Sequence, residues 1–252
     1  MPVLIFRRIL NFQKEKVEQL EQRLNHRYVP GASFPLQAQL SLAAYTWKPA
    51  QVQNISGNGI GLRIGHQAKA PSPQPARVQL LLAGHKLEFD ARLTQVRPHP
   101  DGIYCGLGLN FADFLAQKTY LQLLQPIAIG QSLQPVAQDR VIQNEPQFIK
   151  QIYRGESNSV LTVWLKMTMG TPLHSFEFRM HDYFCRAKMS TGVLEAYALE
   201  STGSHLAKLS NPVFDTAGGL HDEIRQLFRW IVPNLSEGVP DDVRAFLQKF
   251  AG

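Results

Sequence analysis

The sequence predicts an α+β protein of two domains: an N-terminal helix, a small antiparallel β-barrel with a following helix, and a C-terminal α+β domain. Three observations support this fold class. An apolar stripe at helical spacing opens the chain, period-two apolar runs follow, and the second half combines such runs with two amphipathic segments at its end. The predicted boundaries are an N-terminal amphipathic helix at 1–25, a barrel at 26–126, a linker at 127–145 and a C-terminal domain at 146–252.

The first helix is predicted between residues 4 and 26, where apolar side chains recur at spacings of three and four. Gln13 interrupts this stripe, which favours docking of the helix on the next domain over a coiled coil of three heptads. Pro30 ends the pattern because it disfavours helical geometry at Val29.

The barrel is predicted from apolar runs of period two that are separated by Gly, Pro, Asn and Asp turns. These runs are FPLQAQLSLAAYTW, VQNI, IGLRI, RVQLLLAG, KLEFDARLTQV and IYCGLGLNF. Such a pattern indicates an antiparallel sheet that closes into a sandwich or barrel. The segment ADFLAQKTYLQLLQP then has helical spacing, and we expect Pro126 to stop this helix.

The C-terminal domain opens with a predicted helix, since Asn144 and Pro146 form a helix start and Gly155 a stop. Three strand-like runs follow: SVLTVWLKM, HSFEFRMHDYFCRAKM and VLEAYALES. LHDEIRQLFRWIV and PDDVRAFLQKF predict two closing helices, the second with Asp241 and Asp242 in the first turn, where the helix dipole favours them.

Composition limits the function classes. A formal net charge of +6 and a pI near 9.4 favour an anionic partner, although the basic residues are scattered. No apolar run reaches the roughly 18 residues of a membrane span, and no secretory signal is evident, so we expect a cytoplasmic protein. Cys105 and Cys185 lie in apolar stretches and are predicted to be buried free thiols.

Catalytic and metal-binding patterns are absent from the sequence: it has no HExxH, paired CxxC, GxSxG, P-loop or GxGxxG after a strand. His181 and Asp182 are expected on opposite faces of one strand. His221 and Asp222 are expected at a helix start, where Asp compensates the dipole. We therefore expect no catalytic residue, no metal and no enzyme, with an enzyme in the second domain as an open alternative.

Two short motifs lie near the first two predicted strands of the barrel. Arg23 and Arg27 immediately precede this strand, and Asn54, Ser56 and Gly59 form a polar turn after the next one. Taken alone, the turn is explained as an ordinary hairpin, because Asn and Ser bond their own backbone and glycine supplies positive φ. The arginine spacing also recurs in a predicted C-terminal helix, so neither motif is specific by itself.

In this order, however, the motifs resemble the PilZ domain, the bacterial receptor module for cyclic di-GMP. The family's two signatures are RxxxR and [DN]xSxxG, which here read Arg23-Leu-Asn-His-Arg27 and Asn54-Ile-Ser56-Gly-Asn-Gly59. YCGLGLNF also resembles the closing strand of the family. The resemblance covers about residues 22–126 and implies a six-stranded barrel. It also implies that the two arginines clamp the ligand from a flexible segment, while the other three residues form a wall on the barrel.

The chemistry of the ligand agrees with this resemblance. An arginine fork matches phosphate oxygens bidentately and also matches the O6/N7 edge of guanine. Asn54 and Ser56 offer hydrogen bonds, while Gly59 permits the turn and close approach of a ligand. Many family members carry a basic residue directly before the first arginine, and here this residue is Gln22. The resemblance associates this position with binding of one or two ligand molecules, so the stoichiometry stays open.

The resemblance therefore implies a non-enzymatic cyclic di-GMP receptor whose output is motility, biofilm formation or exopolysaccharide production. Ordering of residues 22–30 by the ligand is the expected coupling step. No cofactor beyond this ligand and no nucleic acid is expected. A protein partner or self-association through the N-terminal helix or the C-terminal domain is expected instead. The alternative is a PilZ-like barrel that binds no ligand and acts as a protein-interaction scaffold.

Overall fold

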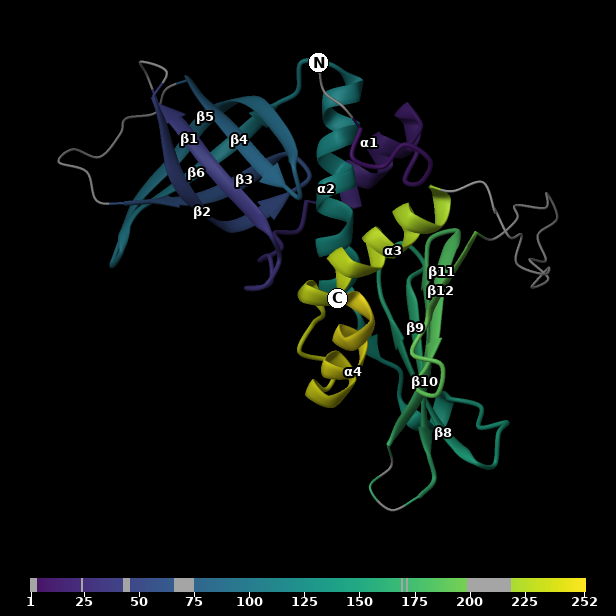
Figure 1. The fold of residues 1–252 in the computed structure, drawn as a ribbon. Coiled ribbons are helices and arrows are strands. Elements are labelled where there is room, and N and C mark those ends of the chain that lie inside the picture. Colours follow the sequence, from purple (N-terminus) through teal and green to yellow (C-terminus); the bar gives the residue numbers. More distant parts are fainter. Residues whose placement is uncertain are drawn as a thin grey trace. The chain divides into compact units, whose positions relative to one another are not determined.

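The computed structural model describes residues 4–23, 25–42, 46–65, 75–168, 170, 172–198 and 219–252, except for the side chains of residues 22 and 23. These residues form the predicted α+β architecture (Figure 1). The chain divides into two units, residues 1–127 and 128–252, and each is built on one antiparallel sheet. No helix in the described ranges is long and apolar enough to cross a bilayer.

The first unit contains a closed barrel with the strand order β1-β2-β3-β6-β5-β4, as the resemblance implied. The strands are β1 (Leu36–Leu42), β2 (Trp47–Ser56), β3 (Gly59–Ile64), β4 (Pro75–Leu82), β5 (His85–His99) and β6 (Gly102–Asn110). The barrel closes because β1 pairs with β4 along its whole length. On β5, buried Leu87, Phe89 and Ala91 alternate with exposed charged residues, which is the period-two pattern of a barrel wall.

The N-terminal helix α1 is shorter than predicted, because it spans only Lys14–Arg23 and the described residues before it are irregular. Leu10 has a φ of 51°, which a right-handed helix cannot contain. The irregular backbone bonds a side chain of the next helix instead: Ile5 N and Phe6 N donate to Gln122 Oε1 at 3.1 Å. Gln122 Nε2 also donates to the carbonyl oxygen of Phe6 at 2.9 Å. Before Lys14 the apolar spacing thus predicted burial correctly but helix wrongly, and from Lys14 to Arg23 the predicted helix is present.

Helix α2 spans Phe114–Ser132 and contains Pro126, so the prediction that this proline ends the helix is wrong. The lost backbone hydrogen bond is offset by burial, since Leu123, Leu124, Ile127 and Ile129 around the proline are fully buried. The predicted linker at 127–145 consequently begins inside α2. It also contains the two-residue strand β7 (Gln134–Pro135) and the 3₁₀ turn η1 (Gln138–Arg140).

The second unit contains an antiparallel sheet with the strand order β12-β11-β10-β9-β8-β7. Its longer strands are β8 (Phe148–Arg154), β9 (Val160–Lys166), β10 (Leu173–Met180), β11 (Tyr183–Lys188) and β12 (Leu194–Ala198). His181 and Asp182 form the turn between β10 and β11 and do not lie within one strand, which corrects the sequence-based placement.

Strand β8 replaces the helix predicted between Asn144 and Gly155. It pairs with β9, and Ser157 and Asn158 in the connecting turn both have positive φ, as a tight hairpin requires. The segment that suggested a helix start is bonded to β8 through the side chain of Gln143. Lys150 N donates to Gln143 Oε1 at 2.8 Å, and Gln143 Nε2 donates to the carbonyl oxygen of Lys150 at 2.9 Å.

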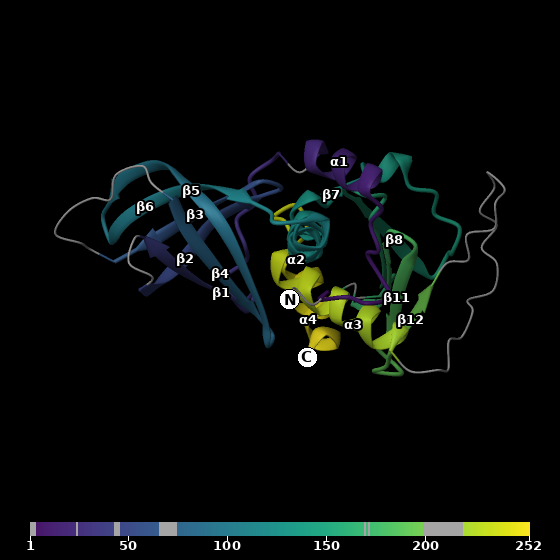
Figure 2. The ribbon, with the colours of Figure 1, turned by 90° about the horizontal axis from the view of Figure 1, so that it is seen from above.

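Helices α3 (Leu220–Ile231) and α4 (Asp241–Ala251) pack on one side of this sheet (Figure 2), and the 3₁₀ turn η2 (Val232–Asn234) follows α3. Asp222 lies in the first turn of α3, and Asp241 and Asp242 lie in that of α4, which confirms these helix-start predictions. Phe176 on β10 stacks on Phe228 of α3 with ring centroids 5.4 Å apart. The core of the second unit therefore lies between β10 and these helices.

Candidate functional site

The hairpin between β2 and β3 carries the Asn-Ser-Gly motif. Ser56 pairs with Gly59 across a turn of two residues, and none of residues 56–59, all of which the structure describes, has positive φ. Gly59 is therefore not required by the turn, contrary to the prediction. A Cβ atom at Gly59 would lie 3.0 Å from the carbonyl oxygen of Leu107, so the absence of a side chain lets β3 pack closely on β6.

A buried tyrosine on α2 fixes this hairpin. Tyr120 Oη donates to the carbonyl oxygens of Ser56 at 2.6 Å and Gly59 at 3.2 Å. Burial raises the pKa of Tyr120 well above its usual value, so the hydroxyl keeps the proton that it donates. The Ser56 Oγ atom lies within 3.3 Å of the Gly59 carbonyl oxygen and 3.4 Å of Asn58 Oδ1, its hydrogen-bond acceptors.

The segment between α1 and β1 reaches the same hairpin through Tyr28. Tyr28 N donates to the Ile55 carbonyl oxygen, and Ile55 N donates to the Tyr28 carbonyl oxygen, both at 2.8 Å. Tyr28 is buried, and the antiparallel bridge places Arg27 beside Ser56. Arg27 itself is exposed and makes no hydrogen bond or ion pair with any residue that the structure describes.

A cavity of about 280 Å³ on the barrel brings together Arg27, Asn54, Ser56 and Gly59. These are four of the five residues predicted for the site, and they come from three separate segments of the chain. The fifth, Arg23, is the last residue of α1, and its side chain lies outside the described part of the structure.

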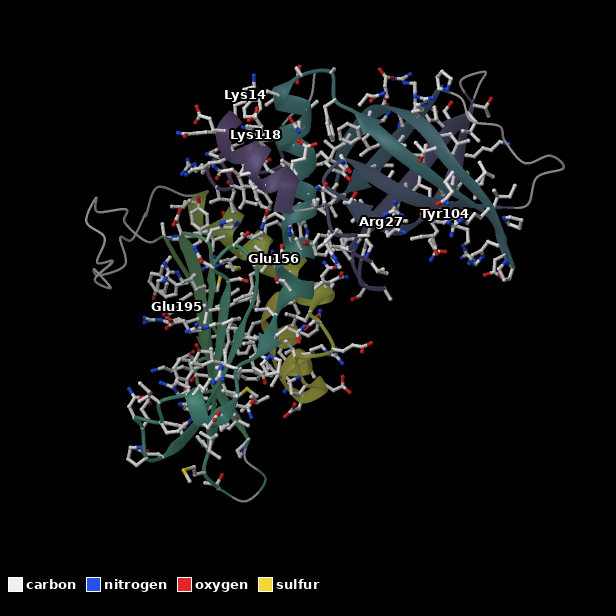
Figure 3. All side chains as sticks on the ribbon, turned by 180° about the vertical axis from the view of Figure 1, so that it is seen from behind. Lys14, Arg27, Tyr104, Lys118, Glu156 and Glu195 are labelled. Carbon is white, nitrogen blue, oxygen red and sulfur yellow. The ribbon has the colours of Figure 1, made fainter. Side chains whose placement is uncertain are left out.

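Tyr104 on β6 also lines the cavity and was not predicted from the sequence. It lies close to Arg27 on the barrel (Figure 3). Asn54 Nδ2 donates to Tyr104 Oη at 3.4 Å, so the tyrosine orients the amide of the motif. Gly61 makes room for this contact: a Cβ atom there would lie 2.5 Å from Tyr104 Oη and 2.7 Å from Asn54 Nδ2.

Paired glycines form the floor of this site. Gly59 lies opposite Gly108, and Gly61 lies opposite Gly106, on the neighbouring strands β3 and β6. Gly59, Gly106 and Gly108 line the cavity without a side chain. The space beside Gly61 is filled by the side chains of Asn54 and Tyr104. The repeated patterns GIG and GLG in the sequence are the signal that could have revealed this floor.

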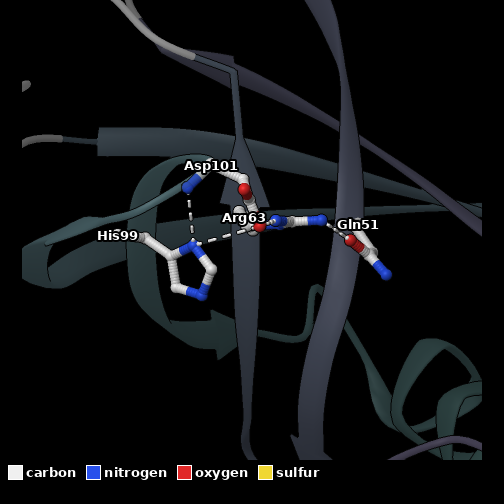
Figure 4. A network of polar contacts seen from close by, with 4 residues as sticks. All are labelled: Gln51, Arg63, His99 and Asp101. Atoms are coloured by element: carbon white, nitrogen blue, oxygen red, sulfur yellow. Dashed lines mark hydrogen bonds and ion pairs between the residues drawn. The ribbon is translucent and has the colours of Figure 1, made fainter.

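Two other arginines of the barrel, Arg63 and Arg77, are engaged in local pairs. Arg63 bonds both Asp101 and Gln51, and Asp101 N donates to His99 Nδ1 at 3.2 Å (Figure 4). Arg77 in turn lies 3.0 Å from a carboxylate oxygen of Glu88. Arg27, by contrast, presents its guanidinium to the cavity without a protein partner in the described ranges.

The two cysteines are buried and free, which confirms the prediction. Burial raises the pKa of Cys105 to about 11 and also raises that of Cys185, so both thiols stay protonated at neutral pH. Among the described residues, no cluster of three or more His, Cys, Asp and Glu side chains is arranged to hold a metal ion.

The family model of the PilZ domain matches residues 21–126 of this chain. Similar solved structures include the PilZ domain of CeSA from a cellulose-synthesizing bacterium, at 16% identity over 39% of this chain and 94% of that chain, with a TM-score of 0.32. PlzA of Borreliella burgdorferi, solved in complex with c-di-GMP, matches at 10% identity over 69% of this chain and 86% of that chain, with a TM-score of 0.34. The Legionella protein Lpg0364, described as uncharacterized, matches at 16% identity over 39% and 89% of the two chains, with a TM-score of 0.26. No curated protein matches the sequence.

Proposed function

Because residues 21–126 form a PilZ domain, we propose that this chain is a receptor that binds cyclic di-GMP through the cavity on its barrel. The observation that carries the proposal is the convergence of Arg27, Asn54 and Ser56 on one cavity whose floor is made of glycine. Residues 28–53 separate the two motifs in sequence, and the Tyr28–Ile55 bridge brings the motifs together in space.

In this proposal the guanidinium of Arg27 binds a phosphate or a guanine of the ligand. A planar guanidinium donates two parallel hydrogen bonds either to a phosphate or to the O6/N7 edge of guanine. Arg27 has no competing ion pair among the described residues, so ligand binding need not break one. Its exposure lets the side chain close over a ligand that enters the cavity.

The barrel side of the site supplies short polar contacts and close approach. The Asn54 amide is held by Tyr104, and the Ser56 hydroxyl is held at the hairpin, so both groups are oriented before ligand arrives. Gly106 and Gly108 line the same cavity and carry no side chain to obstruct a purine ring. In this proposal the cavity holds one guanine with its adjacent phosphate.

Coupling to an output would use the segment between α1 and β1. Tyr28 is already fixed on the barrel, so the ligand would act on the stretch from Gln22 to Arg27 that joins this anchor to α1. A ligand that binds one arrangement of this stretch more tightly shifts the protein toward it. We propose that the shift changes what the first helix or the second unit offers to a protein partner, with motility, biofilm formation or exopolysaccharide production as the regulated process.

Isothermal titration calorimetry with cyclic di-GMP tests the proposal, using the wild type and the variants Arg23→Ala and Arg27→Ala. A charge-assisted hydrogen bond contributes about 1.5–3 kcal/mol, so each variant should bind about tenfold more weakly or worse. The titration also gives the stoichiometry that Gln22 leaves open.

Arg229→Ala is the matched control, because Arg225 and Arg229 repeat the four-residue spacing on α3. This variant should bind cyclic di-GMP with unchanged affinity. A wild type that shows no binding would overturn the receptor proposal and favour an interaction scaffold. Equal losses in Arg229→Ala and Arg27→Ala would show that general charge, and not the barrel cavity, attracts the ligand.

A further inference from the structure

A second cavity, of about 410 Å³, lies in the second unit on the sheet formed by β8 to β12. Alternate residues of β10 point to opposite faces, so Phe176 and Phe178 pack toward the helices while Glu177 faces the cavity. The volume falls in the range of roughly 300–1,000 Å³ that is typical of small-molecule sites. None of its residues belongs to the PilZ domain or to the motifs of the sequence.

A row of charged side chains crosses this face of the sheet. The register places Glu177, Arg186 and Glu195 side by side on β10, β11 and β12, and Glu195 is labelled in Figure 3. Arg186 Nε donates to Glu195 Oε2 at 2.6 Å, and Arg186 Nη2 donates to Tyr197 Oη at 2.9 Å. The Arg186 guanidinium also lies 4.9 Å from the centroid of the Tyr197 ring. Arg186 is therefore held toward β12 by Glu195 and Tyr197.

This arrangement leaves Glu177 without a direct partner. Its carboxylate is half-buried and makes no hydrogen bond or ion pair with any described residue. Burial raises the pKa of Glu177, although Arg186 and Arg179 act in the opposite direction. An unpaired carboxylate that is partly withdrawn from water is unfavourable for the folded protein. A cationic group that enters the cavity would remove this cost.

The charge balance of the cavity also favours a cation. Glu145, Glu177 and Glu195 line it, against the two cations Arg186 and Lys188, so the lining is negative in a chain whose net charge is +6. Burial and the neighbouring lysines lower the pKa of His174, which keeps this ring neutral at pH 7. The charge of the cavity lining is therefore negative, whereas the net charge of the chain is positive.

Aromatic side chains form the remaining wall. Trp164 Nε1 donates to Glu145 Oε1 at 3.0 Å, which fixes the orientation of the indole ring. Phe148 stacks on His174 with ring centroids 4.6 Å apart. Fixed aromatic rings attract a cation through their faces and pack against its apolar part.

We propose that this cavity binds a small organic cation, an amine or a guanidinium, with its charge on Glu177 and its apolar part against Trp164 and Phe148. A free metabolite such as agmatine and an arginine side chain of a partner protein both carry such a cation beside an apolar chain. The site is separate from the cavity on the barrel, so its occupancy is measured without cyclic di-GMP.

Isothermal titration calorimetry of the full chain with two probes tests this site: agmatine, and a short peptide with blocked ends whose single charged residue is an arginine. The variants are Glu177→Gln, Trp164→Leu and, as a matched control, Glu237→Gln at an exposed position of the same unit. We expect at least one probe to bind the wild type and Glu237→Gln equally. The same probe should bind about tenfold more weakly to Glu177→Gln and several-fold more weakly to Trp164→Leu.

The two probes distinguish the sources of the cation. Preference for agmatine indicates a free metabolite, and preference for the peptide indicates a partner's arginine. Absence of binding by both probes at millimolar concentration would overturn the proposal. It would be overturned equally if Glu177→Gln, with a wild-type circular dichroism spectrum, bound the probes as tightly as the wild type.

Discussion

The two cavities of this protein are built in opposite ways. The cavity on the barrel has a floor from which side chains are missing, because Gly59, Gly106 and Gly108 line it. The cavity of the second unit is formed by large side chains that stand on an open sheet face, such as Trp164 and Arg186. The first therefore depends on space that must stay empty, and the second on groups that must be held in place.

The two cavities also differ in the charged side chains that line them. On the barrel, an unpaired arginine at the rim faces backbone and short polar groups, which suits an anionic ligand. In the second unit, Arg186 is bound by Glu195, while the carboxylate of Glu177 and the ammonium of Lys188 line the cavity without an ion pair among the described residues. The charges proposed to meet a ligand, Arg27 on the barrel and Glu177 in the second unit, have opposite signs.

Gly61→Ala should have the largest effect, because its methyl group would enter the space that the Asn54 and Tyr104 side chains of the site occupy. The new Cβ atom would lie 2.5 Å from Tyr104 Oη and 2.7 Å from Asn54 Nδ2, so both side chains must move. We expect overpacking to lower the free energy of unfolding by about 1–3 kcal/mol and the affinity for cyclic di-GMP to fall about tenfold or more. Chemical denaturation and calorimetry measure the two effects.

Gly65→Ala is the control for this substitution, since it lies just beyond β3 and its Cβ atom would meet nothing within 4 Å. It should leave both stability and affinity nearly unchanged. Unaltered affinity in Gly61→Ala would mean that the position of the Asn54 amide does not matter for the ligand.

The barrel and most of its site could be predicted because their signals are local in sequence. Period-two runs gave all six strands, and RxxxR and [DN]xSxxG each occupy a few consecutive residues. The GIG and GLG patterns are local too, but their pairing with each other and the place of Tyr104 in the site depend on the register between β3 and β6. The same limit applies to the second cavity, whose charged row is assembled across three strands.

The wrong secondary-structure predictions have equally specific causes. The stripe from Phe6 onward marks buried residues, but Gln122 bonds the backbone in place of a helix. Pro146 and Gly155 suggested the two ends of a helix, but pairing of β8 with β9 outweighed these local preferences. In both places a contact with a distant segment decides the backbone conformation, and such contacts have no local signature.

Tyr104→Phe should have an intermediate effect, because it removes only the hydroxyl that orients Asn54. A neutral hydrogen bond contributes about 0.5–1.5 kcal/mol, and the donor–acceptor distance of 3.4 Å places this one at the weak end. We expect cyclic di-GMP to bind about two- to fivefold more weakly by calorimetry. Tyr153→Phe removes a hydroxyl that donates to Gln151 in the second unit, and it should not change the affinity. Equal effects of both variants would contradict an orienting role for Tyr104.

Glu177→Gln should have the smallest effect on stability, and its sign is informative. Burial raises the pKa of Glu177 in the folded protein, so between the unfolded and folded pKa values the folded state binds more protons. The wild type therefore loses stability relative to Glu177→Gln as the pH rises through this window, and the difference persists above it. Water screens the half-exposed carboxylate, so we expect the Tm of the variant to be higher by only about 1 °C at pH 7, with no difference at a pH below both pKa values.

Differential scanning fluorimetry across this pH range measures the effect of Glu177→Gln, with Glu237→Gln as the reference. A Tm at pH 7 that falls in Glu177→Gln would show that the carboxylate has a stabilising partner within the protein and is not kept for a ligand.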